Sequence, residues 1–150
     1  MKNIFEQTIT DEVISRINSL NADSQPQWGK MSVAQMLAHC CVSYEMVYED
    51  KHKKPNPFMR LILKSFVKKA VVNEIPYKPG SPTAPAFVIK GDKDFEAEKK
   101  RLTNYIIRAQ QSGEAYFDNK ESLSFGPLTK TEWNNLFYKH LDHHLRQFNV

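Results

Sequence analysis

Apolar residues recur with a helical period in four separate segments of this chain, and this pattern limits the fold more than any other feature. The segments cover about residues 10–20, 32–50, 92–113 and 129–148. Apolar side chains three and four residues apart lie on one side of a helix. We see no strand with convincing apolar/polar alternation. The sequence therefore predicts an all-α fold, a four-helix bundle.

Two motifs mark where helices begin. Ser32 is followed three residues later by Gln35, and Thr129 is followed in the same way by Glu132. In each pair the first side chain can accept a hydrogen bond from the backbone of the third helical residue, whose own side chain reaches back. This is the capping-box pattern. We therefore expect the second long helix to begin after Ser32 and the last one after Thr129.

An extra short helix is expected between the second and third long helices. In a helix over residues 57–70, Arg60, Lys64 and Lys68 lie on one stripe and apolar side chains face the other way. We interpret the basic stripe as the solvated face of a helix that packs against the bundle. Two alternatives stay open: the stripe binds an acidic partner, an anionic membrane surface or nucleic acid, or the apolar face forms a homodimer contact.

A long proline-rich loop should follow the short helix. Residues 72–91 contain Pro76, Pro79, Pro82 and Pro85, which exclude a helix and favour extended backbone. We interpret this segment as an ordered loop that lies across the bundle. The even spacing also resembles a proline-rich recognition motif, which is the alternative.

Composition indicates an ordinary globular protein. The chain has 150 residues, of which 41% are hydrophobic and 25% charged, so we expect one domain over residues 1–150. The first residues lack the apolar core of a signal peptide, and no apolar run is long enough to cross a bilayer. Cys40 and Cys41 are adjacent and suit a reducing compartment. A net charge of +4 does not point to nucleic acid. We therefore expect a cytoplasmic protein with no nucleic-acid or membrane partner.

The histidines of the last helix lie where a solvated side chain has no reason to be. On a helical wheel His140 and His144 lie at the centre of the face that must be buried, together with Trp133. Lys139 and Asn135 fall on the opposite side. Imidazoles four residues apart lie on neighbouring turns, so both can bind one metal ion.

The third ligand must come from another helix. His39 is the best candidate, because it lies in the middle of the most apolar segment. His52 lies in a run of lysines and should be solvated. Three imidazoles leave a coordination position open, as catalytic metal sites do. The alternative is that the three histidines are core residues satisfied by hydrogen bonds.

Three more residues are candidates for supporting roles. Gln35 lies one turn before His39, and Gln147 shares the face of the histidine pair, so either amide can orient a ligand or substrate. His143 lies at the edge of the apolar face. We place it beside the site or on the surface rather than among the ligands.

The stretches WGKMSVAQMLAHC (28–40) and FGPLTKTEWNNLFYKHLDHHLRQF (125–148) resemble the DinB-like family of four-helix-bundle proteins, and most closely an uncharacterised branch of it. In that family one histidine of the second helix and an HxxxH pair on the last helix hold a divalent metal. The resemblance therefore implies that His39, His140 and His144 bind one divalent ion. It covers most of the chain in helix order and gives residues 52–91 no role.

The resemblance also implies a class of activity. Some family members use the metal to add a low-molecular-weight thiol to an electrophile, or to isomerise or hydrolyse small substrates. We therefore expect a metal-dependent enzyme that acts on a small molecule, with zinc or nickel as the ion and iron as the next candidate. Two hypotheses compete with it: a non-catalytic binding module that uses the basic helix, and a bundle whose metal is purely structural.

Overall fold

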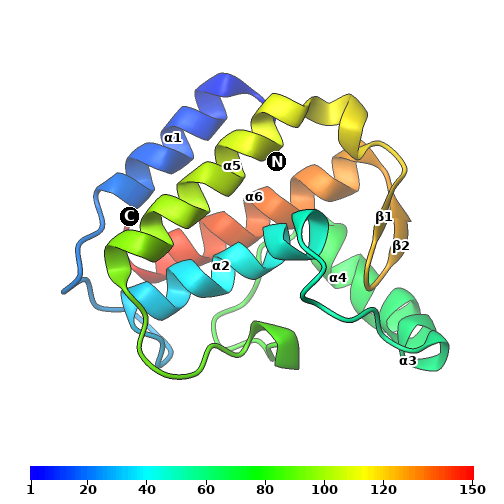
Figure 1. The fold of residues 1–150 in the computed structure, drawn as a ribbon, viewed down its shortest axis with the longest axis horizontal. Coiled ribbons are helices and arrows are strands. Elements are labelled where there is room, and N and C mark those ends of the chain that lie inside the picture. The colour runs from blue at the N-terminus through cyan, green and yellow to red at the C-terminus, as the bar shows by residue number, and fades with distance from the viewer.

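The computed structural model describes residues 1–150, and most of them are helical. Four long helices lie side by side in Figure 1 and contact one another. They are α1 (Gln7–Asn18), α2 (Val33–Tyr48), α5 (Phe95–Phe117) and α6 (Lys130–Gln147). The prediction of a mostly helical chain is confirmed.

The apolar stripes of the four long helices meet in one core of 25 buried residues. Ile17 of α1, Leu37 of α2, Ile106 of α5 and Phe137 of α6 are each no more than 1% exposed. Twelve of the 16 residues of α2 are buried, so this helix is enclosed on almost all sides. That burial agrees with its composition, which is apolar around most of the helix.

Side-chain caps begin the helices where the sequence predicts. Ser32 and Thr129 each form a complete capping box, and Asp94 accepts a hydrogen bond from the backbone of Ala97 at the start of α5. The expected end of α5 near Gly113 needs correction. Gly113 has φ 72° and ψ 169°, so the helix kinks there but resumes for one more turn.

The connection between α2 and α5 contains three short helical pieces: α3 (Pro57–Ile62), the π-helical η1 (Leu63–Val67) and α4 (Lys68–Val72). The solvated basic face that we expected is wrong for two of its three residues. Arg60 forms an ion pair with Glu121, and Lys68 forms one of 2.7 Å with Glu132, so both face the body of the protein. Lys64 is exposed, as expected, and part of the apolar side is also turned to solvent.

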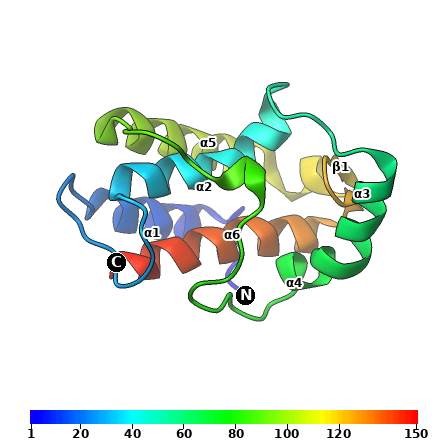
Figure 2. The same ribbon diagram turned by 90° about the horizontal axis from the view of Figure 1, so that it is seen from below.

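The proline-rich segment is a loop, interrupted only by the short 3-10 helix η2 (Pro85–Phe87). Figure 2 shows it passing across α6 and α2 before α5 begins. The loop is held in place by polar contacts, among them a hydrogen bond of 3.0 Å from the side chain of Gln35 to the carbonyl of Gly91.

Residues 114–127, between the last two predicted helices, contain most of a small antiparallel sheet. Strands β1 (Lys120–Ser122) and β2 (Gly126–Leu128) pair so that Lys120 lies opposite Leu128. Three-residue strands are too short to give an alternating pattern, which is why the sequence did not reveal them. None of the helices has the length and apolar character that crossing a membrane requires.

Candidate metal centre

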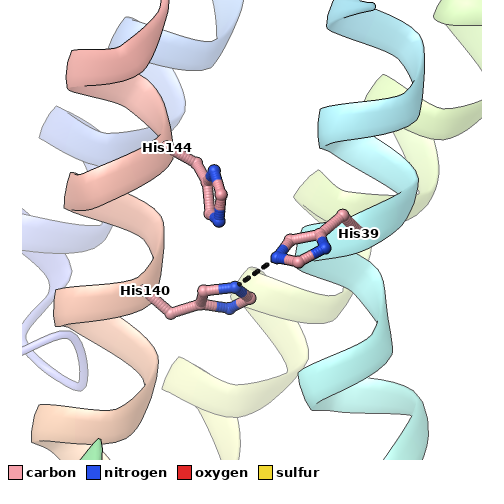
Figure 3. A group of neighbouring side chains, drawn as sticks. All are labelled: His39, His140 and His144. Carbon is pink, nitrogen blue, oxygen red and sulfur yellow. Dashed lines mark hydrogen bonds between the residues drawn. The ribbon is translucent and has the colours of Figure 1, made fainter. Parts of the chain in front are cut away.

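Helices α2 and α6 bring three histidines to one point, as Figure 3 shows. Each of His39, His140 and His144 offers a ring nitrogen, and the three atoms lie within 4.8 Å of one another. The ring centroids are 4.5–4.9 Å apart in every pair. The three side chains are buried, although His140 as a whole residue keeps some exposed surface. No other group of histidines, cysteines and carboxylates in the chain has this arrangement.

Two of the rings are oriented by hydrogen bonds on their outer nitrogen, Nδ1. His39 donates from Nδ1 to the carbonyl oxygen of Phe87 at 2.8 Å, and His144 donates from Nδ1 to Oε1 of Gln147 at 2.8 Å. Both oxygens can only accept, so both Nδ1 atoms carry the proton. The inner nitrogens, Nε2, therefore keep their lone pairs. Such outer hydrogen bonds are the usual way in which a protein orients imidazole ligands of a metal.

The third ring, His140, has a partner that suits two protonation patterns. Its Nδ1 lies 3.0 Å from Oγ of Ser43, and its Nε2 lies 2.9 Å from Nε2 of His39. Since Nε2 of His39 can only accept, His140 donates from Nε2 in this arrangement and accepts from Ser43. A hydroxyl can also accept. When the proton of His140 is on Nδ1 instead, Ser43 accepts a hydrogen bond from it and Nε2 is free to bind an ion.

The spacing of two of the rings, His39 and His140, is close to that required by a small divalent ion. Two nitrogens bound to one tetrahedral zinc at the usual bond length lie about 3.3 Å apart. The Nε2 atoms of His39 and His140 are 2.9 Å apart. The two rings would thus have to separate by only a few tenths of an ångström, as estimated from that bond length.

Burial keeps the three imidazoles neutral. Burial lowers the pKa of His39, and it lowers the pKa of His140 to well below its ordinary value. For His144, burial together with the neighbouring His39 lowers the pKa to about 3. Only the neutral imidazole offers a lone pair to a metal, so protons do not compete for these nitrogens near neutral pH.

Gln147 is itself fixed by the chain between α1 and α2. Its Nε2 donates to the carbonyl of Trp28 at 2.6 Å, and Gln147 is only 3% exposed. The adjacent Gly29 has φ +84°, and a Cβ atom there would lie 2.7 Å from Nε2 of Gln147. The close approach therefore requires glycine at this position. Trp28 and Gly29 thus hold the amide that orients His144.

Of the other two residues predicted beside the site, His143 lies next to it, with its ring centroid 5.0 Å from that of His144, and Gln35 lies farther out. Gln35 caps α2, where its Oε1 accepts from the backbone of Ser32, and no contact joins it to the histidine rings. His143 packs between Trp28 and Tyr77, with ring centroids 5.7 Å away on each side. Its pKa is lowered, chiefly by burial.

Two contacts of the site were missed by the sequence reasoning. Phe87 of η2 provides the carbonyl for His39, and its ring lies 5.4 Å from the ring of His39 and 5.6 Å from that of His140. Ser43 lies on α2 one turn after His39, so the helical spacing could have identified it. Nothing in the sequence indicates that a residue of the proline-rich loop returns to the site.

The placement of Lys139 and Asn135 on an outward side of α6 is wrong. Lys139 is 3% exposed and donates from Nζ to the carbonyls of Ala70 and Asn73 and to Oδ1 of Asn73 at 2.7–2.9 Å. Asn135 donates to the carbonyl of Val72 at 2.9 Å. Both residues satisfy backbone oxygens at the end of α4, which covers this side of α6. Burial lowers the pKa of Lys139 to about 8.

The expectation that His52 is solvated also needs correction. Its Nε2 lies 2.7 Å from Oε2 of Glu45, and the ring is half-buried. Glu45 is 4% exposed and attracts His52, Lys51 and Arg101, all within hydrogen-bond distance. A buried carboxylate needs such partners, so Glu45 holds the start of the basic segment, residues 51–72, against α2.

Comparison with known proteins yields one family. The model of the family described as "Protein of unknown function (DUF1569)" matches residues 3–150. Neither the curated proteins nor the solved structures gave a match. Because the family match extends over almost the whole chain, this protein belongs to the DUF1569 family.

Proposed function

We propose that this protein is a metal-dependent enzyme with the DinB-like four-helix-bundle organisation, and that it acts on a small molecule by thiol transfer or hydrolysis. The observation that carries the proposal is the convergence of His39, His140 and His144, each with its Nδ1 bonded to a separate outer partner. The sequence resemblance to the DinB-like family supplies the reaction class.

The donor set suits a divalent transition metal. Three neutral imidazoles without a carboxylate or thiolate favour zinc, nickel or iron over magnesium and calcium, which prefer oxygen ligands. Of these we propose zinc or nickel, with iron as the next candidate. His39 and His144 already present unprotonated Nε2 atoms, and His140 does so in the tautomer whose Nδ1 donates a hydrogen bond to Ser43.

Three protein ligands suit a reactive site better than a purely structural one, which is usually closed by four. A divalent ion held here would supply Lewis-acid chemistry and leave a position for a small molecule. Gln147 and the carbonyl of Phe87 hold protons on the outer nitrogens, which keeps the inner nitrogens of His144 and His39 free. The ring of Phe87 covers His39 and His140 and excludes water from that side.

One observation favours a second explanation, in which the histidines are ordinary core residues. The 2.9 Å contact between Nε2 of His39 and Nε2 of His140 satisfies both nitrogens without an ion. This explanation gives no role to His144, whose hydrogen bond uses its outer nitrogen. Metal analysis separates the two explanations.

Elemental analysis of purified wild-type protein, His140→Ala and His143→Ala tests the site. His143 is the matched control, because it lies on the same helix and contacts His144 but points to Trp28 and Tyr77. We expect one divalent ion per chain in the wild type and in His143→Ala, and none in His140→Ala. If the wild type takes up no zinc, nickel or iron even after reconstitution, the three histidines are core residues that bind no metal.

Activity is tested on the metal-loaded protein with low-molecular-weight thiols and small electrophiles, and with small ester and amide substrates. His144→Ala should lose both the metal and turnover. Turnover that persists without the metal would contradict the proposal. Chelation that unfolds the protein, with no turnover in any of these assays, would favour a structural ion instead.

A further inference from the structure

The helical segment of residues 57–67, which comprises α3 and η1, exposes its large apolar side chains. No residue of either element is buried. Phe66 is 80% exposed, Phe58 73% and Leu61 62%. Isolated apolar residues are common on protein surfaces, but a group of this kind on one short segment marks a site of interaction.

The orientation of this segment is the reverse of that of an ordinary surface helix. A surface helix normally packs its apolar side on the core and presents its charged side to water. Here Arg60 and Lys68 pair with Glu121 and Glu132 of the body, while Phe58 and Phe66 point away from it. Ion pairs thus hold the segment together with Leu63, which packs against the core. The side chains of Phe58, Leu61 and Phe66 remain free for a partner.

The charged residues of the segment itself all have one sign. Residues 51–72 contain no aspartate or glutamate, and their seven basic residues are Lys51, Lys53, Lys54, Arg60, Lys64, Lys68 and Lys69. The whole chain carries only +4, so the rest of the chain is net negative. Lys53, Lys64 and Lys69 are exposed and take part in no ion pair, unlike Arg60 and Lys68.

We propose that residues 51–72 dock this protein onto an anionic lipid surface. Phe58, Leu61 and Phe66 enter the boundary between headgroups and acyl chains, and the lysines attract acidic headgroups. Exposed aromatic and aliphatic side chains next to unpaired lysines are the combination by which peripheral segments bind anionic bilayers without crossing them. The inference is independent of the histidine cluster and replaces our expectation that a membrane is not a partner.

The position of the segment suits a flat surface. Figures 1 and 2 show α3 at one end of the molecule in both views, outside the group of long helices. A second copy of this chain is a poorer occupant, because a two-fold contact through this face would bring its lysines near each other. Nucleic acid would attract the lysines but would gain little from the exposed Phe58 and Phe66.

Vesicle co-sedimentation of the full chain tests the proposal. The wild type should bind phosphatidylcholine vesicles that contain phosphatidylserine, bind pure phosphatidylcholine vesicles much more weakly, and lose binding as salt is raised. Phe58→Ser/Phe66→Ser and Lys64→Glu/Lys69→Glu should each weaken binding by at least about tenfold. All four side chains are exposed, so circular dichroism and thermal unfolding should match the wild type.

Matched controls separate this surface from general effects. Val88→Ser removes an apolar side chain that is 52% exposed in another loop, and Lys93→Glu/Lys100→Glu makes the same charge change at exposed positions near α5. Both should bind vesicles like the wild type. The proposal would be overturned if the wild-type protein did not bind the vesicles, or if the phenylalanine variant bound them as well as the wild type. So would a shift from dimer to monomer in the phenylalanine variant without any lipid binding.

Discussion

The histidine cluster between α2 and α6 and the segment of residues 57–67 depart from the usual distribution of side chains in opposite ways. The cluster places three imidazoles in the interior, whereas the segment places Phe58, Leu61 and Phe66 in solvent. Polar groups inside a protein and grouped apolar side chains outside it are the informative exceptions to the usual rule. In this protein each exception has a surrounding structure that maintains it.

The means of support differ between the two regions. Each imidazole of the cluster has a hydrogen-bond partner on its outer nitrogen. The basic segment, residues 51–72, is instead held at four places by charged side chains. Glu45 binds Lys51 and His52 at its start, and Glu121 binds Arg60 in the middle. Glu132 binds Lys68, and Lys139 binds the carbonyls of Ala70 and Asn73 at its end. These ion pairs and hydrogen bonds hold the segment in a fixed orientation, so its apolar side chains can remain exposed to solvent.

The largest effect that we expect is on stability: replacing an interior phenylalanine should destabilise the protein far more than replacing an exposed one. Phe137 is 1% exposed and stacks on Tyr44 with ring centroids 4.5 Å apart, whereas Phe66 is 80% exposed. Phe137→Ala should lower the free energy of unfolding by about 3–5 kcal/mol. Phe66→Ala should change it by less than about 0.5 kcal/mol. Urea denaturation measures both, and a large loss for Phe66→Ala would mean that this side chain is packed in solution.

The next effect concerns the residue that joins the two regions. Lys139→Ala removes the ammonium group that donates to three oxygens of Ala70 and Asn73. We expect a loss of about 2–3 kcal/mol in the free energy of unfolding, because hydrogen bonds from a charged group are strong and three are lost together. Amide hydrogen exchange of α4 should become faster. The exposed Lys100→Ala is the control, and unchanged exchange in α4 would contradict this role of Lys139.

Lys139 also shows which features of the structure could be predicted from the sequence and which could not. Periodicity and caps predicted the four long helices, because both signals lie within each helix. The pair His140 and His144 could be predicted in the same way, because both residues lie on one helix. The burial of Lys139 depends on α4 covering a second side of α6, and a helical wheel of α6 alone contains no information about that neighbour. Phe87 was missed for the same reason, since its contact with His39 joins residues 48 positions apart.

Surface orientation was the other property that local patterns could not provide. The wheel of residues 57–70 correctly separated the basic stripe from the apolar one. Which stripe would face the body depended on Glu121 and Glu132, which lie far along the chain. Likewise Gln35 and Gln147 were equally good candidates beside the site. Gln147 lies one turn after His144 on α6, and the chain before α2 fixes its amide in place through Trp28, whereas Gln35 is occupied at the cap of α2.

The two glutamines provide the next test, which depends on the proposed metal site. Gln147→Ala removes the acceptor for Nδ1 of His144 and should weaken binding of the ion by about ten- to a hundredfold. Gln35→Ala should leave that affinity unchanged, although it removes half of the capping box with Ser32 and so costs some stability. Competition with a chelator measures both. Equal losses in the two variants would mean that stability rather than ring orientation sets the affinity.

The smallest effect expected is the pH dependence contributed by Glu45, which holds the start of the basic segment. Burial raises the pKa of this carboxyl group, but hydrogen bonds from Lys51 and His52 and the charge of Arg101 outweigh burial and lower it below 4.5. The folded state therefore binds a proton less readily than the unfolded state. This stability is fully present above the pKa of the unfolded chain and is lost as pH falls through the lower folded value.

Glu45→Gln should lower the free energy of unfolding at neutral pH by about 1 kcal/mol, since the amide keeps part of the hydrogen bonding but not the charge. Below about pH 5 the wild type should lose stability more steeply than the variant, so the two curves approach each other. Urea denaturation across this pH range, with the exposed Glu96→Gln as control, measures the difference. Parallel curves would mean that the pKa of Glu45 is the same in the folded protein as in the unfolded chain. The basic segment would then depend on Glu121, Glu132 and Lys139 alone.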